Sequence, residues 1–133
     1  MKVFIDTSAF YALLDRDDSN HQRAKKEWSD LLHGPDNTLV TTNYVVVESF
    51  ALVHHRLGVE AARGLQENLL SLVNLEWIDA ETHRAGAGAF LAASRRRLSL
   101  VDCVSFEVMR TLGIRTSFSF DPHFKEQGFT LLP

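Results

Sequence analysis

Cysteine, proline and long apolar runs are scarce in this sequence of 133 residues, and each scarcity excludes a class of protein. A single cysteine, Cys103, excludes an internal disulfide and a zinc site built from several thiolates. No apolar run approaches the roughly 20 residues that span a bilayer, and Asp6 comes too early for a signal peptide. We therefore expect no membrane partner, a cytoplasmic location, and one domain over residues 1–133.

An excess of basic residues is also missing. The chain has 14 lysines and arginines against 17 aspartates and glutamates, which gives a formal net charge of -3. Such a protein does not bind nucleic acid through bulk positive charge. Arg95, Arg96 and Arg97 form the densest basic cluster, but a solvated surface would have the same pattern, and the cluster alone identifies no partner.

Short apolar runs alternate with amphipathic segments along the whole chain. The apolar runs predict strands at residues 3–5, 39–41, 75–78, 117–120 and 129–132. The segments between them predict helices at residues 9–14, 20–33, 42–57, 59–73, 81–94 and 102–112. This alternation predicts an α/β protein, a three-layer α/β/α sandwich with a mainly parallel central sheet of about five strands.

Four carboxylates occupy positions that such a fold would bring to one edge of the sheet. Asp6 and Asp121 follow predicted strands, and Asp102 begins a predicted helix that faces the same edge. Asp102 and Asp121 would also serve as helix caps, so both roles stay open. Glu48 is different, because its neighbours one helical turn away are largely apolar and include no arginine or lysine. A buried glutamate in these surroundings favours a bound cation.

Gathering these carboxylates has a chemical consequence. Like charges a few ångströms apart repel, so the cluster stays ionised only if a cation neutralises it. Oxygen ligands select Mg²⁺ or Mn²⁺ rather than zinc, and Mg²⁺ shares its coordination readily with phosphate oxygens. The chemistry that suits this arrangement is attack of a metal-activated water on a phosphodiester. Of the other reactive side chains, we expect Cys103 to be buried and inert and His123 to be a surface histidine.

Five segments resemble a known family: VFIDTSA (3–9), NYVVVE (43–48), LVD (100–102), SFDPHF (119–124) and GF (128–129). Together, in this order, they resemble the PIN-domain nucleases, and among these the VapC-type toxins of toxin–antitoxin pairs. The resemblance implies a Mg²⁺- or Mn²⁺-dependent endoribonuclease that cleaves RNA, forms a homodimer and is inhibited by a small antitoxin. It implies a catalytic and metal-binding quartet of Asp6, Glu48, Asp102 and Asp121. It also implies that polar side chains orient these acids or bind the substrate phosphate: Thr7, Ser8, Asn43 and Ser119.

Three other functions are left open by the sequence. One is a solitary RNA-processing nuclease of the same kind, which would have no antitoxin. Another is a PIN-type binding module without catalysis, although loss of catalysis usually removes an acid and all four are present. The third is a receiver-like protein phosphorylated on Asp6, which would need a lysine at the end of a late strand, whereas Lys125 lies beyond Asp121.

Overall fold

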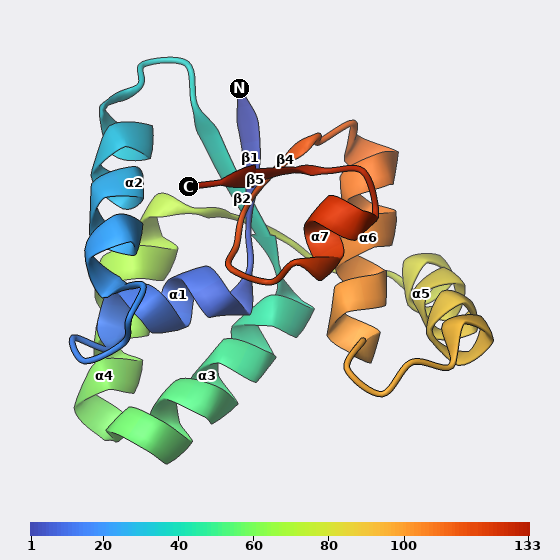
Figure 1. Ribbon diagram of the computed structural model, residues 1–133, viewed down its shortest axis with the longest axis horizontal. Coiled ribbons are helices and arrows are strands. Elements are labelled where there is room, and N and C mark those ends of the chain that lie inside the picture. The colour runs from blue at the N-terminus through green and yellow to red at the C-terminus, as the bar shows by residue number, and fades with distance from the viewer.

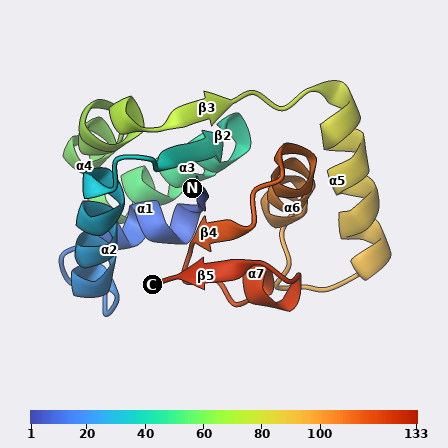
Figure 2. The same cartoon turned by 90° about the horizontal axis from the view of Figure 1, so that it is seen from above.

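A parallel sheet of five strands runs through the centre of the computed structural model, which describes all 133 residues. Figure 2 shows the strands side by side in the order β3-β2-β1-β4-β5. Their bounds are β1 Lys2–Ile5, β2 Thr38–Thr42, β3 Asn74–Glu76, β4 Thr116–Phe118 and β5 Thr130–Leu132. Every neighbouring pair is parallel, so the predicted α/β architecture and the number of strands are confirmed.

Helices cover both faces of this sheet. They are α1 Thr7–Leu14, α2 His21–His33, α3 Asn43–Leu57, α4 Val59–Gly64, α5 Ala80–Ala93, α6 Leu100–Leu112 and α7 His123–Glu126. Figures 1 and 2 show α1, α2 and α4 on one side of the sheet and α5 and α6 on the other. None of the helices is both long and apolar enough to cross a membrane.

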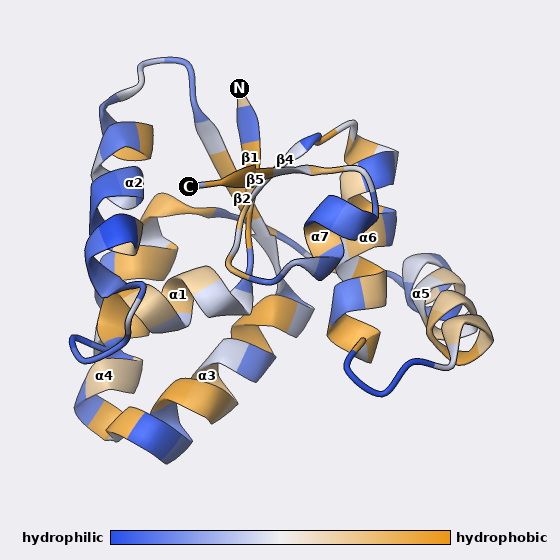
Figure 3. Ribbon diagram, viewed as in Figure 1, coloured by the Kyte–Doolittle hydropathy of each residue, from blue (hydrophilic) through white to orange (hydrophobic).

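Strand β1 lies in the middle of the sheet because its side chains are apolar on both faces. Val3, Phe4 and Ile5 are completely buried, and β1 pairs with β2 on one side and with β4 on the other. A strand covered on both faces reads as a continuous apolar run rather than as an alternating one. Figure 3 shows the outer helix α2 and the loops as largely hydrophilic.

The helix predicted over residues 59–73 is not continuous, and this prediction is wrong. Helix α4 ends at Gly64, a π-helical turn, η1, covers Leu65–Leu69, and a 3-10 turn, η2, covers Leu70–Leu72. Leu65 is completely buried in the core. The wider π turn keeps this side chain in the core while the chain changes direction to enter β3, and hydrophobic periodicity does not reveal such a change.

Candidate active site and metal centre

The carboxyl ends of β1 and β4 and the first turns of α1, α3 and α6 meet at one edge of the sheet (Figure 1). Strands β1 and β4 are neighbours, with Ile5 opposite Phe118. The residues that follow these two strands therefore lie beside each other, although more than 100 positions separate them in the sequence. In open parallel sheets this edge is where ligands bind.

Asp6 is held in place at this edge by hydroxyl groups. Its Oδ2 atom accepts hydrogen bonds from Ser8 Oγ at 2.8 Å and from Ser119 Oγ at 3.0 Å. The same two hydroxyls accept backbone N–H groups of the chain after β4, Ser8 Oγ from Phe120 at 2.9 Å and Ser119 Oγ from Asp121 at 3.0 Å. These bonds draw the chain away from the sheet, and β4 consequently ends at Phe118 rather than at the predicted residue 120.

Asp102 reaches the site from the first turn of α6. Helix α6 begins at Leu100, two residues before the predicted start, and Ser99 is its N-cap. Ser99 Oγ accepts the Asp102 N–H at 3.0 Å, and Asp102 Oδ2 accepts the Ser99 N–H at 3.0 Å. This reciprocal pair is a capping box. Asp102 is therefore not the N-cap that the sequence offered as an alternative, because Ser99 takes that position. As the third residue of the helix, Asp102 completes the capping box with one oxygen while its carboxylate lies in the acidic cluster.

Glu48 reaches the same edge from α3 and has no basic partner. It is half-buried, and the ion pairs of the structure do not include it. Burial raises the pKa of Glu48 above its ordinary value, and the charges of Asp6 and Asp121 raise it further, while the Thr7 hydroxyl lowers it. No lysine or arginine pairs with this glutamate, and the cation that the sequence favours beside it stays a prediction.

The carboxylates of the quartet disturb one another's ionisation. The pKa of Asp6 is raised to about 6, mainly by burial and in addition by the charges of Asp102 and Asp121, against the opposing hydrogen bonds from Ser8 and Ser119. Burial also raises the pKa of Asp102, where the charges of Asp121 and Glu48 act in the same direction and the Ser99 hydrogen bonds act against it. A cluster of this kind favours protons or a cation.

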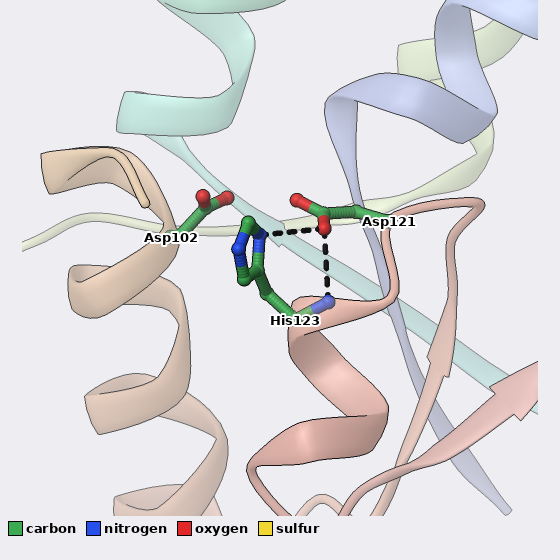
Figure 4. Close-up of side chains that lie close together, drawn as sticks. All are labelled: Asp102, Asp121 and His123. Atoms are coloured by element: carbon green, nitrogen blue, oxygen red, sulfur yellow. Dashed lines mark hydrogen bonds and ion pairs between the residues drawn. The ribbon is translucent and has the colours of Figure 1, made fainter. Parts of the chain in front are cut away.

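His123 belongs to this cluster, and the prediction of a surface histidine is wrong. The residue is only 9% exposed, and Figure 4 shows its imidazole between the carboxylates of Asp102 and Asp121. One ligand atom from each of the three residues lies within 4.8 Å of the other two. The backbone explains the placement, because the His123 N–H donates to Asp121 Oδ1 at 2.9 Å and turns the side chain back toward the site. The sequence signal that could have indicated a histidine in the site is its position two residues after Asp121, which follows a strand.

The donor atoms at this edge fit a divalent cation. Donor atoms of Asp102, Asp121 and His123 lie within 4.8 Å of one another, and the charges of Asp6 and Glu48 act on the same carboxylates. None of the four acids pairs with a lysine or arginine. The Nδ1 atom of His123 is buried and makes no hydrogen bond of acceptable geometry, although it lies 2.8 Å from Asp121 Oδ1. Buried polar atoms are normally satisfied, so an orphaned nitrogen among carboxylates is consistent with an ion that completes the site.

The polar residues that the resemblance assigns to substrate binding lie around the acidic cluster. One of them, Asn43, also has a structural role. Asn43 begins α3, and its Oδ1 atom accepts the N–H of Ile78 at 2.8 Å, which anchors the chain after β3 and ends that strand early. Thr7 is buried and accepts a hydrogen bond from Ser49 Oγ at 3.4 Å. Contacts of these side chains, and of Ser8 and Ser119, with substrate stay predictions.

Comparison with known proteins agrees with this geometry. The family model of the PIN domain matches residues 3–129 of this chain. The 23S rRNA-specific endonuclease VapC20 of Mycobacterium tuberculosis is 32% identical over 128 residues, which cover 96% of this chain and 95% of the relative. The crystal structure of M. tuberculosis VapC20, described as a Sarcin-Ricin loop cleaving toxin, superposes with a TM-score of 0.86 at 31% identity and covers 96% of both chains.

Two more distant structures have the same fold. VapBC2 from Rickettsia felis, bound to a DNA fragment from its promoter, gives a TM-score of 0.73 at 12% identity over 98% of this chain and 97% of the other. FitAcB from Neisseria gonorrhoeae gives a TM-score of 0.67 at 16% identity, and the match covers 100% of this chain and 97% of the other. Since the match spans almost the whole sequence and includes all four carboxylates at the sheet edge, the chain belongs to the PIN-domain family.

Proposed function

We propose that this chain is a Mg²⁺- or Mn²⁺-dependent endoribonuclease and the toxin of a toxin–antitoxin pair. The observation that carries the proposal is the convergence of four carboxylates, none of them paired with a lysine or arginine, at the ligand-binding edge of a parallel sheet. A divalent ion bound there would activate water and stabilise the charge that develops on a phosphodiester during in-line attack. Family membership supports the same chemistry.

Each residue of the site has a part in this proposal. Asp6 and Asp102 would be the main ligands of the ion, Glu48 would complete its shell or act through water, and Asp121 would be the peripheral member. Ser8 and Ser119 fix the orientation of Asp6 through their hydrogen bonds to Oδ2, so the ligand does not need to be ordered when the ion binds.

We propose ribosomal RNA of the large subunit as the substrate. The support is the identity of 32% over nearly the whole chain with an enzyme named for cleavage of 23S rRNA. The test is to incubate purified protein with ribosomes and with total RNA and to sequence the new 5′ ends. We expect one dominant cut in the large-subunit rRNA with Mn²⁺ or Mg²⁺ and none with a chelator. New ends confined to transfer or messenger RNA would contradict the proposed substrate but not the nuclease.

The same assay tests the site. We expect Asp102→Asn to remove cleavage, because the amide loses the charge that binds the ion. The matched control is Asp36→Asn, since Asp36 is exposed in the loop before β2, at the opposite edge of the sheet. Cleavage by Asp102→Asn at the rate of the control would refute the assignment.

The arginine loop between α5 and α6 is our candidate for contact with the RNA backbone. Arg95 pairs with Glu126 at 3.1 Å, whereas Arg96 and Arg97 are exposed and form no ion pair. The loop leads directly into the first turn of α6, which carries Asp102, and Figure 3 shows it as strongly hydrophilic. Two free arginines beside an acidic site supply the positive charge that the chain as a whole lacks.

Replacing both free arginines, Arg96→Ala with Arg97→Ala, should weaken RNA binding and leave the cleavage rate at saturation unchanged. Loss of two phosphate contacts on single-stranded RNA should reduce the slope of log K against log salt by about 1.4. The matched control is Lys2→Ala with Arg115→Ala, which removes the same charge at the amino ends of β1 and β4. Fluorescence anisotropy over a salt series is the measurement. An equal change in both variants would show a general charge effect and refute a role for the loop.

The protein partners that we propose are a second copy of this chain and a small antitoxin. Val47 on α3, Trp77 after β3 and Leu91 on α5 are each at least 69% exposed and offer apolar contact surface. A hollow of about 340 Å³ lies beside Glu48, lined by Asn43, Tyr44, Val47 and Val101. These surfaces support a homodimer and an antitoxin that covers the site. Light scattering of the isolated chain, and of the chain co-expressed with the product of a short neighbouring reading frame, measures both.

A further inference from the structure

We propose that His123 is a nitrogen ligand of the bound ion and makes the site select Mn²⁺ over Mg²⁺. This inference rests on the metal site of the proposed function and extends it to the choice of ion. The sequence predicted an oxygen-only ligand set, and the structure adds an imidazole to it.

The position of the imidazole is the first observation. His123 Nδ1 lies 2.8 Å from Asp121 Oδ1, and a donor atom of Asp102 lies within 4.8 Å of both residues' donor atoms. Two adjacent ligands of an octahedral ion at about 2.1 Å are themselves about 3 Å apart. The spacing between nitrogen and oxygen thus fits two ligands on one ion, and since a charge-assisted hydrogen bond has the same length, the geometry of the contact decides between the two.

The missing hydrogen bond is the second observation. His123 is one of the more buried polar residues of the chain, yet Nδ1 has no hydrogen-bond partner of acceptable geometry, so the close approach to Asp121 is not an ordinary hydrogen bond. Leaving a buried polar atom unpaired costs about 1–3 kcal/mol. A metal ion gives the nitrogen a partner. By contrast, Nδ1 of His21, which is equally buried, lies 2.7 Å from the carbonyl of Ala12.

Ligand chemistry then determines the ion. Mg²⁺ is a hard cation that binds oxygen and retains water, whereas imidazole is a common ligand of the first-row transition ions. Exchanging one oxygen for an imidazole nitrogen therefore lowers the relative affinity for Mg²⁺ and raises that for Mn²⁺. We expect the wild-type protein to bind Mn²⁺ at least about tenfold more tightly than Mg²⁺, because only Mn²⁺ gains from the imidazole ligand.

The direct test is electron spin-echo envelope modulation of Mn²⁺ bound to the purified protein, without RNA. Nitrogen bound to Mn²⁺ produces a ¹⁴N modulation that oxygen ligands do not. We expect this modulation in wild type and in the control variant His33→Gln, because His33 is exposed at the end of α2, and not in His123→Gln. Modulation that persists in His123→Gln, or is absent from Mn²⁺-loaded wild type, would overturn the inference.

Calorimetric titration with MnCl₂ and MgCl₂ gives a second readout. His123→Gln should lose at least about tenfold in Mn²⁺ affinity and less than about threefold in Mg²⁺ affinity. His123→Asp supplies an oxygen in place of the nitrogen, so it should recover metal binding with the preference shifted toward Mg²⁺. Circular dichroism and the melting temperature without metal verify that each variant is folded.

The outcomes separate this inference from the proposed function. If His123 instead carries a positive charge that pairs with Asp121, its removal will tighten Mn²⁺ binding, and the ligand role is refuted while the acidic site stands. If neither ion binds the folded wild type, the metal site itself is refuted, and with it the metal-dependent nuclease.

Discussion

Replacing Asp6 with asparagine should abolish RNA cleavage and at the same time make the metal-free protein more stable at pH 7. The carboxylate is 4% exposed and lies among three other acids, so its ionised form is disfavoured in the folded state. A pKa of about 6 against the ordinary value of 3.8 corresponds to about 3 kcal/mol, most of which asparagine removes. Asparagine is also a good N-cap, so the start of α1 is retained.

The effect on stability depends on pH in a defined direction. Because the pKa of Asp6 is raised on folding, the folded state binds this proton more tightly than the unfolded state does. The stabilisation is fully present below about pH 4 and is lost as the pH rises through about 6. Metal-free wild type should therefore become less stable from pH 4 to pH 7, and Asp6→Asn should show a smaller decline.

Urea unfolding in the presence of a chelator at pH 5 and pH 8 measures this difference. We expect the free energy of unfolding of Asp6→Asn to exceed that of wild type at both pH values, by about twice as much at pH 8 as at pH 5. Mn²⁺ should raise the melting temperature of wild type and not of the variant, because only the wild type binds the ion. A variant that is less stable than wild type at pH 8, or that cleaves RNA, would refute the arrangement described for Asp6.

Gly86→Ala should destabilise the fold more than any other glycine-to-alanine change within α5. Gly86 is buried where α5 crosses α6, and a Cβ atom there would lie 2.5 Å from Val104 Cγ2 and 3.0 Å from Val104 Cα. The neighbouring atoms include backbone, so the two helices must separate. Overpacking of this kind costs about 1–3 kcal/mol. Since α6 carries Asp102, the displacement should also reduce metal binding.

Gly88→Ala is the matched control in the same helix. A Cβ atom at Gly88 meets nothing within 4 Å, so this change should stabilise the protein by up to about 1 kcal/mol through helix propensity alone. Both changes gain the same propensity, and the difference between their free energies of unfolding isolates the contact with Val104. Equal stabilities would show that α5 and α6 are not packed as closely as the structure indicates.

The sheet and most of the site could be predicted because they depend on local signals. Val3, Phe4 and Ile5 form an apolar run that only a central strand buries, and Asp6 and Asp121 follow strands whose ends meet at one edge. Glu48 was identified by its apolar neighbours. Each of these inferences uses residues within one helical turn or one strand, together with the general topology of parallel sheets.

The parts that could not be predicted depend on packing between distant segments. The burial of His123 requires α7, a single turn, to lie against α6. The π turn at Leu65 depends on how this side chain packs in the core. The bond from the Ile78 N–H to Asn43 Oδ1 depends on the path of a loop 35 residues away, and the predicted contact of Asn43 with substrate stays a prediction. The catalytic roles, the extent of one domain over residues 1–133 and the cytoplasmic location stay predictions.

The hydrogen bonds around the acids limit how each can bind an ion. Asp102 Oδ2 accepts the Ser99 N–H, and Asp6 Oδ2 accepts two hydroxyls, so one oxygen of each carboxylate is already engaged. Asp6 cannot chelate an ion through both oxygens without breaking these bonds, because both lone pairs of its Oδ2 atom are engaged, whereas Asp102 Oδ2 keeps one lone pair. An ion attached through single oxygens keeps several coordination positions occupied by exchangeable water, and these are the positions that an incoming phosphate can take.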